Sequence, residues 1–85
     1  MDRRLDEFVL RCDVVMEQVF MRRFDERRAF VHWLRGLIAE SDDPFWILHE
    51  HPLYFTAEYL GIDSASVETG QFANAYVRLA QSRGW

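Results

Sequence analysis

Three neighbouring residues, His49, Glu50 and His51, have the side-chain types of a zinc site, and Glu58 follows them. Zinc is held in proteins by histidine, cysteine and carboxylate side chains, usually three or four of them. Two residues that are two positions apart on a helix point about 200° away from each other, so both imidazoles can bind one ion only if Pro52 ends the helix. We expect no metal and no cofactor, with His49 at the surface and His51 at a helix end. A small metal- or ligand-binding protein remains the weakest of three hypotheses.

Cys12 and His32 are the residue types of a nucleophile and its base. Cys12 lies among apolar residues at helical spacing, and an apolar setting raises the pKa of a thiol and leaves it unreactive. The sequence has no glycine-rich phosphate loop, no serine nucleophile elbow and no carboxylate pair with evident acid–base geometry. We therefore expect no catalytic residue and a protein that is not an enzyme.

A stretch of forty-two residues, 36–77, contains no lysine or arginine. It holds seven of the fourteen acidic residues and seven of the thirteen aromatic residues, and the whole chain has a net charge of −4. This balance disfavours binding to nucleic acid or to anionic membranes, which requires accumulated positive charge. We call residues 36–77 the basic-free segment.

Aromatic side chains of the basic-free segment fall at helical spacing, which puts Phe55 and Tyr59 on one helix face with Trp46 across a predicted turn. Such rings fill a core, or they form an aromatic contact surface for a partner. Carboxylates around that surface suit a protein partner, and a basic one in particular. The residues that we predict to contact the partner are Trp46, Glu50, Tyr54, Glu58 and Glu68.

Four arginines surround Asp25 and Glu26 near the end of the first third of the chain. They form a basic patch for a phosphate or an acidic partner, or they pair with their own neighbouring carboxylates. The patch also complements the basic-free segment of a second copy, which makes a homodimer an alternative. The patch residues are Arg22, Arg23, Arg27 and Arg28.

Residues 53–72 contain the elements of a tight turn between two crossed helices. A small residue stands where the helices touch, a glycine stands at the left-handed turn position, and apolar residues stand before and after it: Ala57, Leu60, Gly61, Ile62 and Val67. The segment resembles the helix-turn-helix pattern of bacterial and phage DNA-binding proteins. The resemblance implies that a second helix, from Ser64 onward, enters the major groove and reads bases.

The segment also departs from that family in two ways. Gly70 stands where the family has an apolar residue, and no basic residue occurs in the second helix before Arg78. Carboxylates such as Glu58 and Glu68 would face the phosphates that supply most of the affinity for DNA. A DNA-binding regulator therefore has to take its charge from Arg78 and the arginine patch, and we keep it as the alternative hypothesis.

The elements that position these residues are all predicted to be helices. Apolar residues recur every three or four positions over 3–21 and over 26–40, the second stripe including Trp33 and Leu34. We expect a break near 22–25, with one continuous helix to residue 40 as the alternative. Asp25 is the predicted N-cap of the second helix.

Shorter helices follow in the second half of the chain. Pro44 and Pro52 begin helices over 45–50 and 52–60, and a last helix runs from residues 63–66 to about residue 82. The sequence predicts a single all-α domain over residues 1–85. Its architecture is a compact bundle of four to five helices that contains a helix-turn-helix-like corner.

Composition narrows the class of protein. The single cysteine is typical of a cytoplasmic protein, and we expect neither a signal peptide nor a membrane span, because the sequence has no long apolar run. All ten basic residues are arginine, which is typical of a bacterial or phage genome rich in G and C. Our leading hypothesis is a small non-enzymatic bacterial or phage protein that presents an acidic, aromatic-containing surface to a protein partner.

Overall fold

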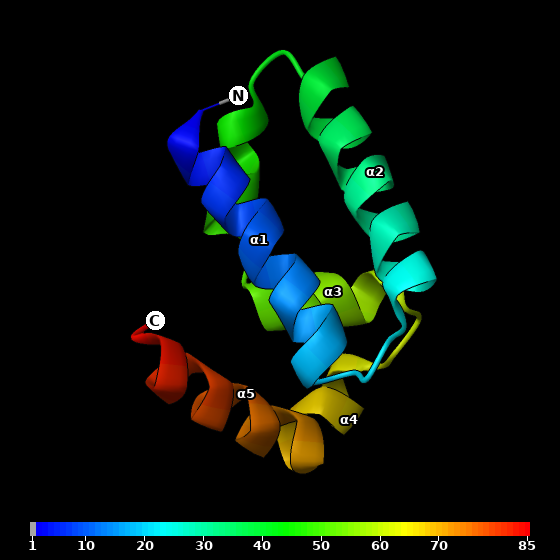
Figure 1. The fold of residues 1–85 in the computed structure, drawn as a ribbon, viewed down its shortest axis with the longest axis vertical. Helices are drawn as coiled ribbons and strands as arrows, with labels where there is room; N and C mark the ends of the chain where they lie inside the picture. The colour runs from blue at the N-terminus through cyan, green and yellow to red at the C-terminus, as the bar shows by residue number, and fades with distance from the viewer. Residues whose placement is uncertain (1) are drawn as a thin grey trace.

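Two long amphipathic helices, α1 (Arg3–Gln18) and α2 (Phe24–Glu40), lie side by side and antiparallel in the computed structural model, which describes residues 2–85 (Figure 1). The carboxylate of Asp2 caps α1 by accepting a hydrogen bond from the Arg4 amide at 2.8 Å. The predicted cap of α2, Asp25, is wrong, because the helix already begins at Phe24. The Glu26 carboxylate instead accepts a hydrogen bond from the Arg23 amide at 3.5 Å.

The predicted break between the first two helices is confirmed, although α1 ends at Gln18 rather than at residue 21. Met21 adopts a positive φ of 55°, which turns the chain without a glycine. The Arg22 amide donates a hydrogen bond to the Met16 carbonyl at 2.9 Å and so closes the end of α1. Asp13 and Glu17 on α1 form ion pairs with Arg27 on α2, at 3.1 and 2.9 Å.

Two prolines begin the next helices, as predicted. A 3-10 helix, η1 (Pro44–His49), follows Asp43, whose carboxylate accepts a hydrogen bond from the Phe45 amide at 3.2 Å. Helix α3 (Pro52–Tyr59) is capped by His51, whose Nδ1 accepts a hydrogen bond from the Leu53 amide at 3.1 Å. Proline suits the first position because its missing N–H has no partner there in any helix.

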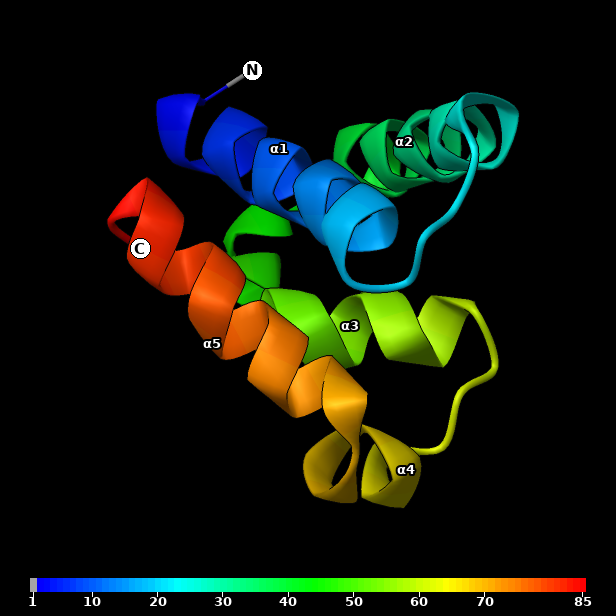
Figure 2. The same ribbon diagram turned by 60° about the horizontal axis from the view of Figure 1, so that its bottom comes forward.

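The single last helix that the sequence predicts is wrong. The structure has α4 (Ser64–Thr69) and α5 (Gln71–Arg83), separated at Gly70, where φ is −117° and ψ is −168° (Figure 2). A Cβ atom at Gly70 would lie 3.0 Å from the Ser66 carbonyl oxygen, so any other residue at this corner would be crowded against the backbone of α4. Before α4, Gly61 has φ of 74° and reverses the chain after α3.

The core consists of two adjoining clusters that α1 joins. One packs α1 against α2 and η1, and the other packs the C-terminal half of α1 against α3, α4 and α5. Figure 2 shows α3 beneath the α1–α2 pair, with α5 crossing it. The all-α prediction is confirmed: residues 2–85 form six helices, of which α1, α2, α3 and α5 have seven or more residues. None of the helices in this part of the chain is long and apolar enough to cross a membrane.

Candidate functional site

Rings from α2 and α3 form an aromatic cluster that is buried on one side and open to solvent on the other. Phe30 and Trp33 are three residues apart on α2, and Phe55 and Tyr59 are four apart on α3, so each pair lies on one helix face. The Trp33 ring centroid lies 5.0 Å from that of Tyr59 and 6.1 Å from that of Phe55. Phe30 is fully buried beneath them, with its centroid 4.7 Å from that of Tyr59.

A pocket of about 410 Å³ opens on this cluster, and we call it the aromatic pocket. Trp46, on η1, lines it but makes no ring contact with the rings of α2 and α3, so the open space separates it from them. The Trp46 indole N–H donates a hydrogen bond to the Ser41 hydroxyl at 3.3 Å, which fixes its orientation. The lining residues are Trp33, Trp46, Glu50, Phe55, Glu58 and Tyr59.

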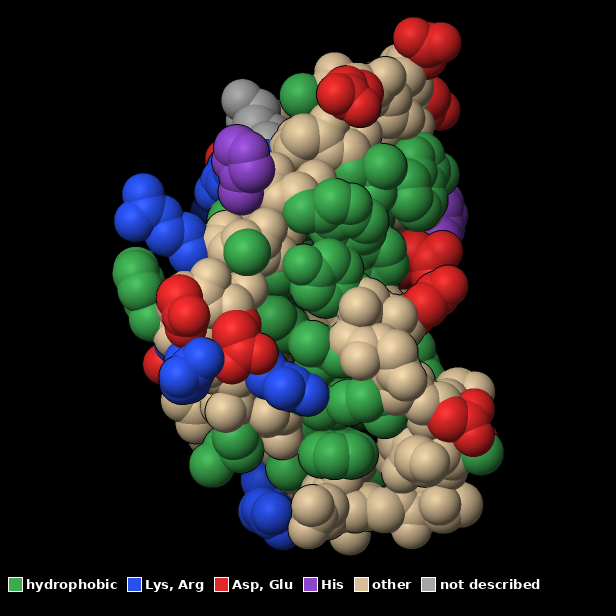
Figure 3. Space-filling model, turned by 90° about the vertical axis from the view of Figure 1, so that its right-hand side faces the viewer, with side chains coloured by type: hydrophobic (Ala, Val, Ile, Leu, Met, Phe, Trp, Pro, Cys, Tyr) green, Lys and Arg blue, Asp and Glu red, His purple; other side chains and the backbone are tan. Residues whose placement is uncertain are grey.

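The rings of the aromatic pocket are exposed at the surface of the molecule. Figure 3 shows one face of the molecule with an apolar area at its centre, carboxylates along one edge and side chains of both charges on the opposite side. Trp33, Trp46 and Tyr59 are each 40–43 % exposed, which leaves large apolar rings in contact with water. Contiguous exposed apolar surface of this kind is typical of an interaction site.

The carboxylates fall into two groups with different surroundings. All seven acidic residues before residue 36 form ion pairs with arginines, at 2.9 to 3.7 Å. Within residues 2–85, none of the seven in the basic-free segment has such a partner, and these include Glu50 and Glu58 of the aromatic pocket. The negative charge of the basic-free segment is therefore not neutralised inside the described chain.

The structure brings together three of the five predicted partner-binding residues. Trp46, Glu50 and Glu58 line the aromatic pocket, whereas Tyr54 and Glu68 lie outside it. The Tyr54 hydroxyl donates a hydrogen bond to Glu68 Oε1 at 3.5 Å. Burial and the neighbouring Glu68 carboxylate raise the pKa of Tyr54. These two residues form a separate pair between α3 and α4.

Sequence reasoning missed Trp33 as a site residue. Its helical spacing placed it in the apolar stripe of α2, which predicts burial, but 43 % of its surface is exposed. The stripe is wider than the face that α1 covers, because Phe30, Leu34 and Ile38 alone are buried along α2. The exposure of Trp33 could have been predicted from its position at the edge of that stripe, three residues after the central Phe30.

Most of the predicted arginine patch is neutralised by its own neighbours. Arg22 lies 3.5 Å from Glu26, Arg23 lies 3.4 Å from the same residue, and Arg27 joins the two carboxylates of α1 described above. Those hydrogen bonds and charges raise the pKa of Arg27. Arg28 is exposed and forms no ion pair within residues 2–85. The self-paired interpretation of the patch thus describes three of its four arginines.

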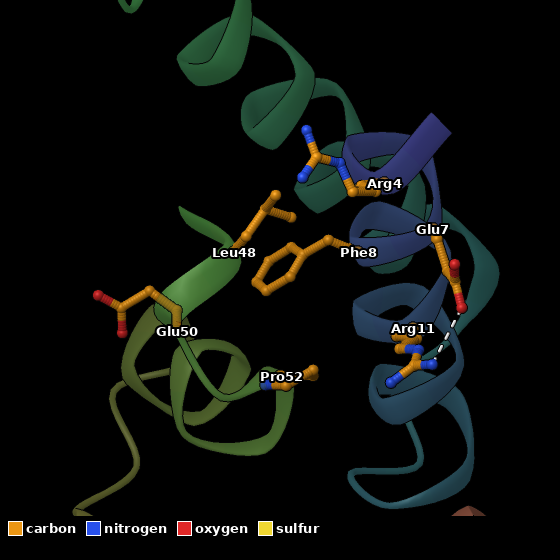
Figure 4. A pocket seen from close by; sticks show the side chains of 7 residues that line it. All are labelled: Arg4, Glu7, Phe8, Arg11, Leu48, Glu50 and Pro52. Carbon is orange, nitrogen blue, oxygen red and sulfur yellow. Dashed lines mark hydrogen bonds and ion pairs between the residues drawn. The ribbon is translucent and has the colours of Figure 1, made fainter. Parts of the chain in front are cut away.

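A second pocket, of about 300 Å³, lies between α1 and the start of α3, with Phe8, Leu48 and Pro52 as its apolar walls (Figure 4). Arg4 and Arg11 line it, but Arg4 is paired with Asp2 and Arg11 with Glu7, at 3.4 and 2.9 Å. Figure 4 shows the Glu50 side chain directed away from Phe8, so Glu50 stands between this pocket and the aromatic pocket.

The residues considered for catalysis or metal binding have structural roles instead. Cys12 is fully buried, and burial raises the pKa of its thiol to about 12, as expected for a core cysteine. His51 uses Nδ1 to cap α3, and burial lowers the pKa of its imidazole. Within residues 2–85, no three His, Cys, Asp or Glu side chains lie close enough together to hold one metal ion.

Comparison with protein-family models, curated proteins and solved structures gives no match for this chain. The helix-turn-helix resemblance over residues 53–72 is therefore untested by these comparisons and stays a prediction.

Proposed function

We propose that the protein is a small non-enzymatic interaction protein that binds a basic protein partner through the aromatic pocket. One observation carries the proposal. Four aromatic side chains surround an open pocket whose two carboxylates, Glu50 and Glu58, have no cation partner within residues 2–85. Aromatic residues dominate the binding energy of protein interfaces, and complementary charge directs the partner to them.

Exposed rings and unpaired carboxylates make different contributions. Burying Trp33 and Trp46 beneath a partner removes apolar surface from water, at roughly 25 cal/mol per Å². The carboxylates of the basic-free segment lower the energy of an approaching cationic surface, and salt weakens that attraction. A neutral partner would gain only the first contribution, which is why we propose a basic one.

Retention of a partner from lysates of the native host tests the proposal. The wild-type chain is compared with Trp46→Ala and Glu58→Arg, and with Glu68→Arg as a control of equal charge change outside the pocket. We expect a partner with a basic surface to be retained by the wild type and by Glu68→Arg, and to be lost with both pocket variants. Equal retention by all four proteins, or equal loss with Glu58→Arg and Glu68→Arg, would contradict a binding site at the pocket.

The helix-turn-helix alternative has one observation in its favour, the reversal at Gly61 between α3 and α4. Against it, α4 has only six residues and contains Glu68, while Arg22, Arg23 and Arg27 are engaged with carboxylates. A DNA reader needs cations at the phosphates. Retention of DNA in a gel-shift titration at low salt would favour this alternative.

The other two alternatives have equally direct tests. A homodimer predicts that the sedimentation coefficient rises with protein concentration and falls when Arg28 is changed to Glu. A metal site at His49 and His51 predicts a higher melting temperature with added zinc. It would also require His51 to give up the α3 cap, because Nδ1 accepts the hydrogen bond from Leu53.

A further inference from the structure

We infer that the aromatic pocket takes an arginine side chain of the partner, which inserts between Trp46 and the rings of α2 and α3. This inference rests on the proposed function and deepens it, because it names the group that anchors the partner. The pocket supplies both things that a guanidinium needs: flat aromatic faces and carboxylate oxygens.

The aromatic walls of the pocket come from two sides. On one side, the Trp33 ring packs against the rings of Phe55 and Tyr59, with centroid separations of 6.1 and 5.0 Å. These separations leave no room for another side chain between the rings. Trp46 stands apart on η1, held by Ser41, and faces the same open space. A ligand group therefore lies over the outer faces of the ring cluster, beside Trp46. A cation in that position lies over aromatic faces, where the ring quadrupole attracts it.

The carboxylates set the sign of the charge that the pocket accepts. Glu50 and Glu58 both line it, and no arginine or lysine does. Arg35, two residues after Trp33 on α2, does not neutralise these carboxylates, because it forms an ion pair with Asp6 at 3.3 Å. Within residues 2–85 the pocket thus has two anionic side chains and no cationic one, which favours a cationic ligand group over an anionic one.

Arginine fits this combination better than lysine does. A guanidinium is planar and stacks on aromatic rings, and its five N–H donors form a fork that can reach two carboxylates at once. It is also less strongly hydrated than an ammonium group, so removing its water costs less free energy. Lysine would present a point charge that gains from the carboxylates but makes little use of the rings.

Titration with short blocked peptides tests the inference by NMR. Four peptides differ at one central position, which is arginine, lysine, citrulline or trimethyl-lysine, within an otherwise identical Gly-Ser sequence. The readout is the indole N–H resonance of each tryptophan at low ionic strength. Trp33 and Trp46 report on the pocket, and Trp85 is an internal control because it packs near Tyr76 and Arg11 instead.

We expect the arginine peptide to shift the resonances of Trp33 and Trp46 but not that of Trp85, and to bind about 3- to 10-fold more tightly than the lysine peptide. Glu58→Gln and Trp46→Leu should each weaken arginine binding, whereas the control Glu68→Gln should not. Trp46→Leu is a safer aromatic variant than a substitution of Trp33, because Trp33 packs against Phe30, Phe55 and Tyr59 whereas Trp46 contacts none of these rings.

Several outcomes would refute the arginine anchor, and some of them leave the proposed basic partner intact. Equal binding of the lysine and arginine peptides would refute the arginine anchor while the basic partner remains. Equal binding of citrulline would show that charge is not recognised, and tighter binding of trimethyl-lysine would assign a different cation. No shift of Trp33 and Trp46 with any peptide refutes the anchor. In that case partner retention by Trp46→Ala and Glu58→Arg decides the proposed function separately.

Discussion

Replacing Phe30 by leucine tests whether the aromatic pocket depends on the core beneath it. Phe30 is fully buried, and its ring lies under the exposed rings, with centroids 4.7 Å from Tyr59, 6.0 Å from Trp33 and 6.4 Å from Phe55. Leucine retains most of the apolar volume but removes all three ring contacts. The substitution therefore withdraws the support of the pocket without placing a polar group in the core.

The cost of Phe30→Leu can be worked from these contacts. A hydrophobic replacement of similar volume costs less than about 1.5 kcal/mol. Aromatic pairs contribute about 0.5–1.5 kcal/mol each beyond their buried area, and the contact with Tyr59 is the closest and edge-to-face. We expect a loss of about 2–3 kcal/mol in the free energy of unfolding. An 85-residue domain has a total of about 4–13 kcal/mol, so the variant still folds.

Urea unfolding followed by far-UV circular dichroism measures this loss, and near-UV circular dichroism reports the packing of the rings. Val67→Ala is the control, because Val67 is equally buried but lies in the other core cluster. We expect both variants to lose stability, but only Phe30→Leu to change the near-UV spectrum and to weaken binding of the arginine peptide. The reasoning is refuted if Phe30→Leu costs less than about 1 kcal/mol, or if the two variants have the same effect on the rings and on binding.

Two further predictions concern stability. Burial lowers the pKa of His51 below the value of 6.5 that it has in the unfolded chain. As the pH falls, the unfolded chain therefore binds a proton at His51 before the folded protein does. The free energy of unfolding is highest above pH 6.5 and decreases as the pH drops from there through the folded-state pKa. Protonation of Nδ1 also removes the cap on Leu53. Urea midpoints between pH 7.5 and 5 should therefore fall less for His51→Asn, which caps without titrating; an equal fall in both proteins would contradict this. Met21→Gly should raise the free energy of unfolding by about 0.5–1 kcal/mol, because Met21 is 78 % exposed and has φ of 55°. Thermal unfolding measures the change, and a lower melting temperature would show that Met21 contributes more by packing than its backbone costs.

Helix starts were the part of the fold that local sequence predicted best. Pro44 and Pro52 stand at the first positions of two helices, as predicted, and Asp2, Asp43 and His51 each accept a hydrogen bond from the first turn of the helix that follows, although the cap at His51 was not predicted. These signals depend on residues within one turn of each other, so the sequence displays them directly. The exception is α2, where a Glu26 carboxylate reaches back to the Arg23 amide and extends the helix beyond the predicted cap.

The corner at Gly70 and the exposure of Trp33 depend on distant contacts. Val67 of α4 and Leu79 of α5 both pack into the cluster around Val15, and a straight helix could not bring both residues there together with Phe72. The presence of Gly70 predicts only a less stable helix at that position, because one glycine lowers helix stability by about 1 kcal/mol relative to alanine and does not by itself end the helix. The exposure of Trp33 likewise follows from where α1 and α3 meet α2, which no local pattern encodes.

The charge division along the chain determines how the aromatic pocket can be used. Six of the eight arginines in residues 1–35 form ion pairs with the seven carboxylates of the same part, so its net charge is only +1 and, within residues 2–85, Arg3 and Arg28 are its two arginines without an ion pair. The fold leaves the seven acidic residues of the basic-free segment unpaired within residues 2–85 and spreads them from the end of α2 to α4. Such a dispersed field attracts any cation without specifying a location. The aromatic pocket is where the field meets exposed rings, so the rings rather than the charge determine which group of a basic partner binds there.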